Sequence, residues 1–161
     1  YIAASLVAYQ KGERKHPTMR GIAISMSEQD IADVSAYYEG QGKGTAAAVP
    51  ATLAKPLPDA LKDKMQVCTT CHGANLNTPI DPSYPKLAGQ HADYLYAVLR
   101  AYGTDGNAYV GRSNASMRSQ VVREADGKKQ LVFTNAELKQ MANYLASLPG
   151  ELKTVPQSRF R

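Results

Sequence analysis

The sequence has little aromatic bulk, which limits the core that it can build. Its 161 residues include two Phe and no Trp, and aromatic residues make up only 7% of the chain. A domain of roughly half this length would therefore have a thin core. Domains of that size usually depend on a staple or a cofactor.

Two further features are absent: a long apolar run and a block of like charge. No stretch approaches the roughly 18 to 20 apolar residues that a membrane-spanning helix needs, and the chain shows no initiator Met, basic leader or cleavage site. The net charge of +5 comes from Lys and Arg scattered along the chain. Scattered charge argues against a nucleic-acid-binding arm, and the excess favours acidic partners or an anionic cofactor.

Part of the chain is repeated. Residues 1–9 (YIAASLVAY) return as residues 94–102 (YLYAVLRAY), and both stretches have the apolar spacing of an amphipathic helix. Further along, HPTMRG resembles NASMRS, which aligns Met19 with Met117. The chain therefore holds two related segments.

Each copy continues into a further helix. Ser27 with Asp30 forms a capping box, and Thr134 with Glu137 stands in the corresponding place of the second copy. Between its Met and its last helix, the second copy carries the additional stretch VVREADGKKQLVF. Its two short apolar runs flank Asp-Gly, which predicts a surface hairpin.

A segment rich in Gly, Ala and Pro separates the two copies. Residues 41–58 are unsuited to a long helix or strand and favour a semi-extended tether. We therefore predict a partial first domain over residues 1–40, this linker, a complete domain over residues 59–149, and a tail over residues 150–161.

Both cysteines stand in the sequence CTTCH, in which His72 directly follows Cys71. A disulfide between Cys68 and Cys71 is one alternative, and thiol oxidoreductases use two cysteines at this spacing. Such motifs usually lie in a βαβ pattern, and this chain shows helices and loops instead. A zinc site would need two further ligands, and His16 and His91 are distant in the sequence. Covalent haem attachment uses both thiols and the adjacent histidine. We favour it because it accounts for every cysteine.

A haem iron bound to His72 would have a second axial position. Methionine is the usual partner of histidine in electron carriers, because its soft sulfur favours ferrous iron and raises the reduction potential. Met65 and Met141 lie on expected helices at apolar spacing, and they and Met26 are better explained as core residues. Met117 lies in the polar segment VGRSNASMRS and is the candidate ligand.

Pro85 is a candidate to orient His72. Its backbone carbonyl would accept a hydrogen bond from the imidazole and so fix the tautomer and the ring direction. The alternative is a simple loop proline. His91 is expected in the first turn of the helix that contains residues 94–102, and His16 is expected in an exposed loop.

These segments together resemble class I cytochromes c, and most closely the dihaem cytochrome c4 type found in bacterial periplasms. The matching stretches are CTTCHG, YPKLAGQHADYLYAVLRAY, GRSNASM and TNAELKQMANYLASLPG. The resemblance implies an all-α class I cytochrome c fold around a covalent haem. It assigns five residues to the haem site: the thioether-forming Cys68 and Cys71, the axial ligands His72 and Met117, and Pro85, whose carbonyl would hold His72.

The resemblance extends to the first copy of the repeat. Residues 1–40 look like the C-terminal half of a first cytochrome c domain, in which Met19 would be the axial ligand of a first haem. The sequence departs from the family there, because no first CxxCH motif precedes Met19. We expect one haem on this chain, and a second if the native chain has a longer N-terminal part. Arg112 and Asn114 are expected to contact a haem propionate or the methionine loop.

The expected function is one-electron transfer and not catalysis. Two filled axial positions leave no open site for a substrate, and the iron changes oxidation state with little rearrangement. Apolar residues would shield the haem from water: Leu95, Val98, Leu99, Leu138, Met141 and Leu145. The rival is a cytochrome subunit of a dehydrogenase complex, such as the dihaem partner of a sulfide-oxidising flavoprotein.

Covalent haem attachment of this kind implies maturation outside the cytoplasm, and we expect a periplasmic protein of a respiratory chain. The resemblance makes a quinol-oxidising complex or a dehydrogenase the expected donor, and a terminal oxidase the expected acceptor. Nucleic acid is not an expected partner. Membrane association is expected only through a partner or through an anchor in a longer N-terminal part.

Overall fold

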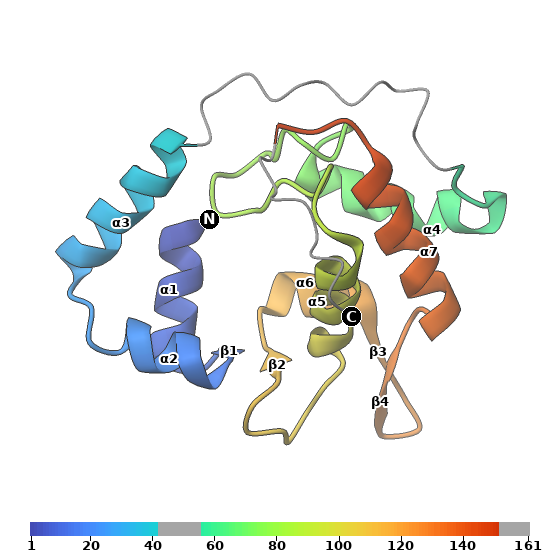
Figure 1. Cartoon of the computed structure of the whole chain (residues 1–161). Helices are drawn as coiled ribbons and strands as arrows, with labels where there is room; N and C mark the ends of the chain where they lie inside the picture. The colour runs from blue at the N-terminus through green and yellow to red at the C-terminus, as the bar shows by residue number, and fades with distance from the viewer. Residues whose placement is uncertain (42–55, 152–161) are drawn as a thin grey trace, which may run out of the picture. The chain divides into compact units, whose positions relative to one another are not determined.

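The computed structural model describes residues 1–41 and 56–151 of the chain (Figure 1). Helices dominate, and the strands are short. The described residues form two compact units, the first from residues 1–41 and 97–134 and the second from the remainder. No helix in the described ranges is both long enough and apolar enough to cross a bilayer.

The first unit combines the N-terminal elements with the middle of the chain. The N-terminal elements are α1 (Ile2–Lys11), β1 (Arg14–Lys15), α2 (Pro17–Ala23) and α3 (Glu28–Gln41). The middle adds the end of α5 (Ala92–Tyr102), β2 (Gly111–Arg112), α6 (Ala115–Val121), β3 (Val122–Ala125) and β4 (Lys128–Leu131). β1 pairs antiparallel with β2, and Arg14 lies opposite Arg112.

This pairing bears on the predicted domain boundaries. Residues 97–134 belong to the predicted domain 59–149, yet they form a compact unit with residues 1–41. The sequence pattern gave no indication of the contact, because β1 and β2 contain two residues each. Strands this short carry no periodicity.

The second unit contains α4 (Asp59–His72), the start of α5, and α7 (Asn135–Ser147). Its buried apolar side chains are Leu61, Met65, Leu76, Ala88, Leu95, Leu138, Met141, Ala142 and Leu145. The buried positions of α7 recur at three- and four-residue intervals, as expected of a helix with one face in a core. The prediction that Met65 and Met141 are core residues is confirmed.

A smaller core lies in the first unit. Leu6, Tyr9, Ala23 and Ile31 form its buried part, and Met19 and Met26 pack against them partly buried.

Val98 and Leu99, which were expected to shield a haem, are only half-buried in the described structure.

A capping box opens α3, as predicted. The Ser27 hydroxyl accepts a hydrogen bond from the Asp30 N–H at 3.1 Å, and the Asp30 carboxylate accepts one from the Ser27 N–H at 2.9 Å. The helix continues to Gln41, one residue into the predicted linker. Residues 42–55 of that linker and residues 152–161 of the predicted tail lie outside the described residues.

The repeat reappears in two short helices of 7 residues each, α2 with Met19 and α6 with Met117. Nδ1 of His16 accepts a hydrogen bond from the Met19 N–H at 3.3 Å. The Asn114 side chain accepts one from the Met117 N–H at 3.0 Å. From the sequence, the segment around Met117 was recognisable only as polar, and in the structure the Asn114 cap supports a helical turn there.

The additional stretch of the second copy forms the predicted hairpin. β3 pairs antiparallel with β4, with Val122 opposite Leu131. Asp126 and Gly127 connect the strands with φ angles of 53° and 68°. Two consecutive residues of positive φ match the twist of a two-residue hairpin turn, which explains the Asp-Gly pair.

The core of the second unit yields a stability prediction. Leu138 is 0% exposed, so Leu138→Ala is expected to lower the free energy of unfolding by about 2 to 5 kcal/mol, from lost burial and the cavity left behind. Gln140→Ala, at an exposed position of the same helix, is the control. It should change the free energy of unfolding by less than about 0.5 kcal/mol. Urea unfolding followed by circular dichroism measures both, and equal effects would contradict this core assignment.

Candidate functional site

The CTTCH motif occupies the last turns of α4, which ends at His72. Residues three apart on a helix lie on neighbouring positions of one face, so Cys68 and Cys71 project from the same side. Both side chains are half-buried free thiols. The two thiols and the histidine therefore come from one rigid element.

His72 is held at one ring nitrogen and open at the other. The residue is 4% exposed, and its Nδ1 lies 2.8 Å from the carbonyl oxygen of Pro85. A carbonyl only accepts, so Nδ1 carries the proton. Nε2 is then the unprotonated nitrogen, and it is buried with no hydrogen-bond partner among the described residues. A buried, unpaired acceptor of this kind suits a metal ion held as a ligand.

The surroundings keep the imidazole in the form that binds metal. Burial lowers the pKa of His72, because the charged ring would lose its hydration, and the hydrogen bond to Pro85 opposes this only in part. The side chain is therefore neutral at neutral pH. Neutral imidazole is the form that coordinates a metal ion.

The two alternatives for the cysteines find no support in the structure. Burial raises the pKa of the Cys68 thiol, whereas an oxidoreductase needs a lowered thiol pKa. Among the described residues, no group of three or more His, Cys, Asp or Glu comes together as a metal site. His16 instead caps α2, and the carbonyl of His91 accepts the first helical bond of α5, from the Leu95 N–H at 3.0 Å.

The loop after α4 places the Pro85 carbonyl. The Asn75 side chain accepts hydrogen bonds from the N–H groups of Asn77 and Thr78 at 3.0 and 2.9 Å. The carbonyl of Leu76 accepts hydrogen bonds from the N–H groups of Leu87 and Ala88 at 2.8 and 3.1 Å. The segment that contains Pro85 is thus closed at its base by the two backbone hydrogen bonds to Leu76, and its start is held by the Asn75 side chain.

The same loop is fastened to α4 and α7. The Ile80 N–H donates to the carbonyl of Cys71 at 3.1 Å, and the Gly89 N–H donates to the carbonyl of Leu145 at 3.0 Å. Sequence reasoning identified Pro85 but missed these contacts. The Asn-rich stretch GANLN was the only available signal, since Asn side chains commonly fold back onto the backbone in turns.

The remaining candidates lie in the first unit. Met117 is half-buried on α6, and Asn114 caps that helix at Met117. The Arg112 guanidinium lies 5.8 Å from the centroid of the Tyr102 ring. Met19 packs partly buried against the small core. The structure therefore gathers Cys68, Cys71, His72 and Pro85 in one unit, and Met117, Arg112, Asn114 and Met19 in the other.

Two thiols on one side of α4, followed by a buried imidazole whose Nε2 has no hydrogen-bond partner among the described residues, are the arrangement expected of a covalent haem site of the c type. The described residues fit that group: His72 would bind the iron through Nε2, and Cys68 and Cys71 would form the thioethers. Residues 62–149 match the family model described as cytochrome c. The chain belongs to the cytochrome c family.

Several known proteins are similar to this chain. Cytochrome c4 of Azotobacter vinelandii is 35% identical over 117 residues, which cover 66% of this chain and 55% of that protein. A protein of Stutzerimonas stutzeri strain A1501 named thiosulfate dehydrogenase electron acceptor is 32% identical over 137 residues, covering 76% and 62%. The structure of Acidithiobacillus ferrooxidans cytochrome c4 superposes with a TM-score of 0.62 at 23% identity, over 92% of this chain and 83% of that chain.

The likeness to that structure establishes the mostly helical cytochrome c fold. The chain spans less than two thirds of the length of these two curated relatives. A CxxCH spacing within a cytochrome c domain is consistent with covalent haem c, which agrees with the sequence prediction.

The close packing of the loop gives a second prediction. Gly73 has a φ of 84°, and a Cβ there would lie 2.1 Å from the carbonyl oxygen of Thr78. Gly73→Ala is therefore expected to displace the loop that contains Pro85 and to destabilise the protein. Gly127→Ala is a matched control, because Gly127 also has a positive φ of 68° but has nothing within 4 Å of such a Cβ.

The control is expected to cost about 1 to 2 kcal/mol, the strain of positive φ alone. Gly73→Ala should cost clearly more and should shift the absorption of the haem. Thermal unfolding and visible spectroscopy of the two purified variants test this. Equal melting temperatures and unchanged spectra would mean that the Gly73 contact does not support the site.

Proposed function

We propose that this protein is a one-electron carrier and not an enzyme. The observation that carries this proposal is the buried Nε2 of His72, which has no hydrogen-bond partner in residues 1–41 and 56–151, while Nδ1 donates to the carbonyl of Pro85. A histidine fixed in this way presents one lone pair in one direction. The cytochrome c family match over residues 62–149 supports the same function.

The protein's own residues would bind, orient and shield the cofactor. Cys68 and Cys71 would attach it to α4, His72 would ligate it, and Met117 is proposed as the second axial ligand. When bound, haem c supplies an iron that exchanges one electron. The buried core residues Leu95, Leu138 and Leu145 exclude water, which limits the solvent reorganisation that accompanies the change of charge.

The first copy of the repeat supports a dihaem arrangement in a longer chain. α1, α2 and α3 follow the same order as α5, α6 and α7, and Met19 stands in α2 where Met117 stands in α6. We accordingly propose residues 1–40 as the C-terminal part of a first cytochrome c domain. Met19 would ligate the haem of that first domain only where the domain is complete. Arg112 and Asn114 are proposed to support the site, Asn114 through its cap on Met117.

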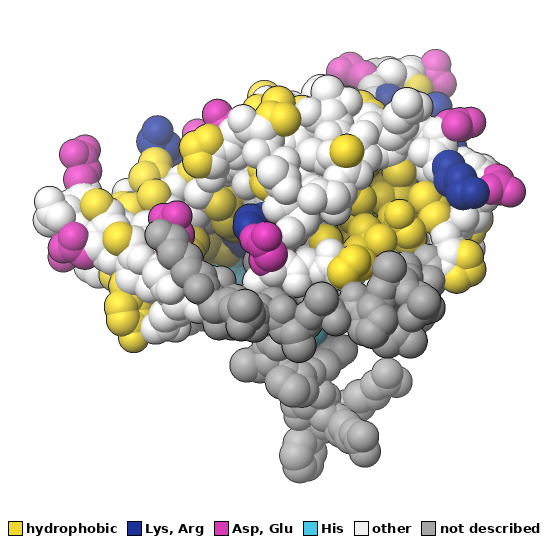
Figure 2. All heavy atoms as spheres, turned by 90° about the horizontal axis from the view of Figure 1, so that it is seen from above, with side chains coloured by type: hydrophobic (Ala, Val, Ile, Leu, Met, Phe, Trp, Pro, Cys, Tyr) yellow, Lys and Arg dark blue, Asp and Glu magenta, His cyan; other side chains and the backbone are white. Residues whose placement is uncertain are grey.

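We further propose a periplasmic location in a respiratory chain, with a quinol-oxidising complex or a dehydrogenase as donor and a terminal oxidase as acceptor. Covalent haem attachment outside the cytoplasm and the similarity to cytochrome c4 support this. On the part of the face in Figure 2 that shows described residues, acidic and basic side chains are scattered and the basic ones do not gather in one broad patch. Such a surface suits small, transient protein contacts better than nucleic acid.

A second candidate is the electron acceptor of a dehydrogenase that oxidises a sulfur compound. It is favoured by the relative named thiosulfate dehydrogenase electron acceptor, which is 32% identical to this chain. The two candidates share one site, and the second narrows the donor to a dehydrogenase that oxidises a sulfur compound. Stopped-flow reduction of the oxidised protein by thiosulfate with thiosulfate dehydrogenase, compared with reduction by a quinol-oxidising complex, separates them. The physiological donor should be faster by at least about tenfold, and a slow reaction with both would reject both donors.

The ligand assignment is tested by matched substitutions at the two repeated methionines. Met117→Ala in the chain of 161 residues should remove the weak near-infrared band of sulfur bound to ferric iron. It should also lower the reduction potential by on the order of 0.1 V, because axial ligands set potentials over a range of roughly 0.8 V. Met19→Ala is the control, and it should leave the band and the potential unchanged. Retention of the band in Met117→Ala would reject Met117 as the ligand.

A further inference from the structure

The loop that leads to Met117 is long and has little regular structure of its own. Between α5 and α6, only β2 is assigned. Local contacts give it a defined path: the Asn107 side chain accepts hydrogen bonds from the N–H groups of Tyr109 and Val110 at 2.8 and 3.0 Å. Arg118 forms an ion pair with Asp105 at 2.5 Å. A ligand at the end of such a loop needs further support to stay in one place.

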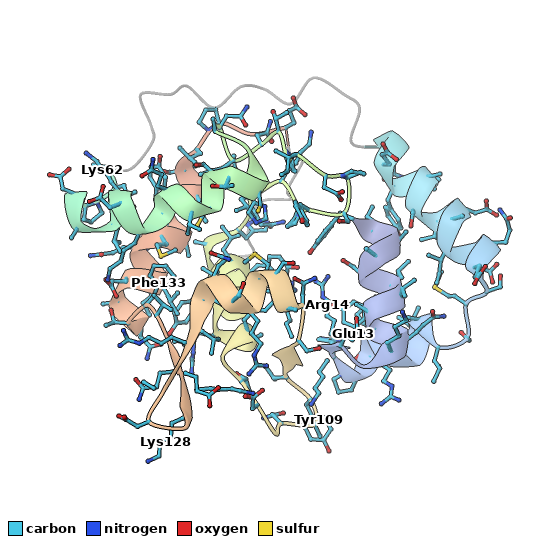
Figure 3. All side chains as sticks on the ribbon, turned by 180° about the vertical axis from the view of Figure 1, so that it is seen from behind. Glu13, Arg14, Lys62, Tyr109, Lys128 and Phe133 are labelled. Atoms are coloured by element: carbon cyan, nitrogen blue, oxygen red, sulfur yellow. The ribbon has the colours of Figure 1, made fainter. Side chains whose placement is uncertain are left out.

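Residues 13–15, which we call the clamp segment, make contacts along this loop (Figure 3). β1 pairs with β2 so that Lys15 lies opposite Gly111. The Lys15 ammonium donates to the carbonyl of Asn107 at 2.7 Å. The Ser113 N–H and hydroxyl both donate to the carbonyl of Glu13, at 2.9 and 3.2 Å. The contacts therefore reach the loop at Asn107 and again at Ser113, the residue before the α6 cap.

The clamp segment is itself fastened to α1. The Arg14 guanidinium donates to the Ser5 hydroxyl at 2.8 Å and to the Tyr1 hydroxyl at 3.3 Å. It also lies 4.7 Å from the centroid of the Tyr9 ring, within range of a cation–π interaction. Tyr9 belongs to the buried core of the first unit. The clamp segment thus connects a packed helix to the loop.

The last contact of the clamp segment is adjacent to the methionine. Ser113, held by Glu13, directly precedes Asn114, whose side chain caps α6 at the Met117 N–H. We propose that residues 13–15 position Met117 for ligation of the haem iron, with Lys15 and Ser113 as positioning residues. The proposal rests on the proposed function, because it takes Met117 as the axial ligand. It gives the first copy of the repeat a role in the ligation carried by the second.

The test compares two double variants of the haem-loaded protein. Lys15→Ala with Ser113→Ala removes the side-chain hydrogen bonds to Asn107 and to Glu13. Lys11→Ala with Ser25→Ala is the control: it makes the same changes of charge and hydroxyl count at exposed positions, where neither side chain makes a described contact to the loop. Imidazole is titrated into each ferric protein, and displacement of the methionine sulfur is followed by loss of the near-infrared band.

We expect the variant Lys15→Ala with Ser113→Ala to bind imidazole about tenfold more tightly than the control, because the loss of two side-chain hydrogen bonds weakens the support of the bound methionine. Lys15→Met, which keeps the aliphatic stem and loses only the ammonium, should give an intermediate affinity. If the double variant fails to fold, this single variant decides: an affinity above that of Lys11→Met supports the clamp, and an equal affinity overturns it.

Two other outcomes are distinguishable. A band that depends on Met117, together with imidazole affinities within about twofold of the control, overturns the clamp and leaves the proposed function standing. A band that persists in Met117→Ala, or is absent from the unsubstituted protein, overturns the ligand assignment and the clamp with it.

Discussion

The hydrogen bond between Nδ1 of His72 and the carbonyl of Pro85 is the interaction on which the rest of the site depends. It fixes the tautomer, so that Nε2 keeps a lone pair, and it fixes the direction in which that lone pair points. The carbonyl stands where it does because the loop is bonded back to Leu76, Cys71 and Leu145. If the loop did not orient the ring, the imidazole would not be directed to bind a metal ion. Its buried nitrogen without a hydrogen-bond partner would then only lower the stability of the fold.

The two proposed axial ligands are positioned by different kinds of contact. His72 is at the end of a long helix and is oriented through its own ring. Met117 is on a helix of only 7 residues, which cannot be rigid by itself. Its position depends on the Asn114 cap and on the strand pairing that reaches Ser113 from Glu13. The same arrangement at Met19, with His16 as the cap, shows that the repeat extends from sequence to hydrogen bonding.

Helices and short-range motifs were predictable from the sequence, because their signals are local. Apolar spacing indicated α5 and α7, the Ser27 and Asp30 pair indicated the start of α3, and Asp126 with Gly127 indicated the hairpin. The cysteine pair and His72 were recognisable from spacing alone. The pairing of β1 with β2 was not predictable, since a contact between residues 14 and 112 leaves no pattern in either. The helix around Met117 was missed because Ser and Asn favour loops as well as caps.

The central claim is that Cys68, Cys71 and His72 hold one covalent haem in this chain. Intact mass spectrometry of the purified protein, before and after treatment with an alkylating agent under denaturing and reducing conditions, tests it most directly. The account predicts a mass equal to the polypeptide plus one haem, with neither thiol open to alkylation. A mass equal to the polypeptide alone, with both cysteines alkylated, would contradict it.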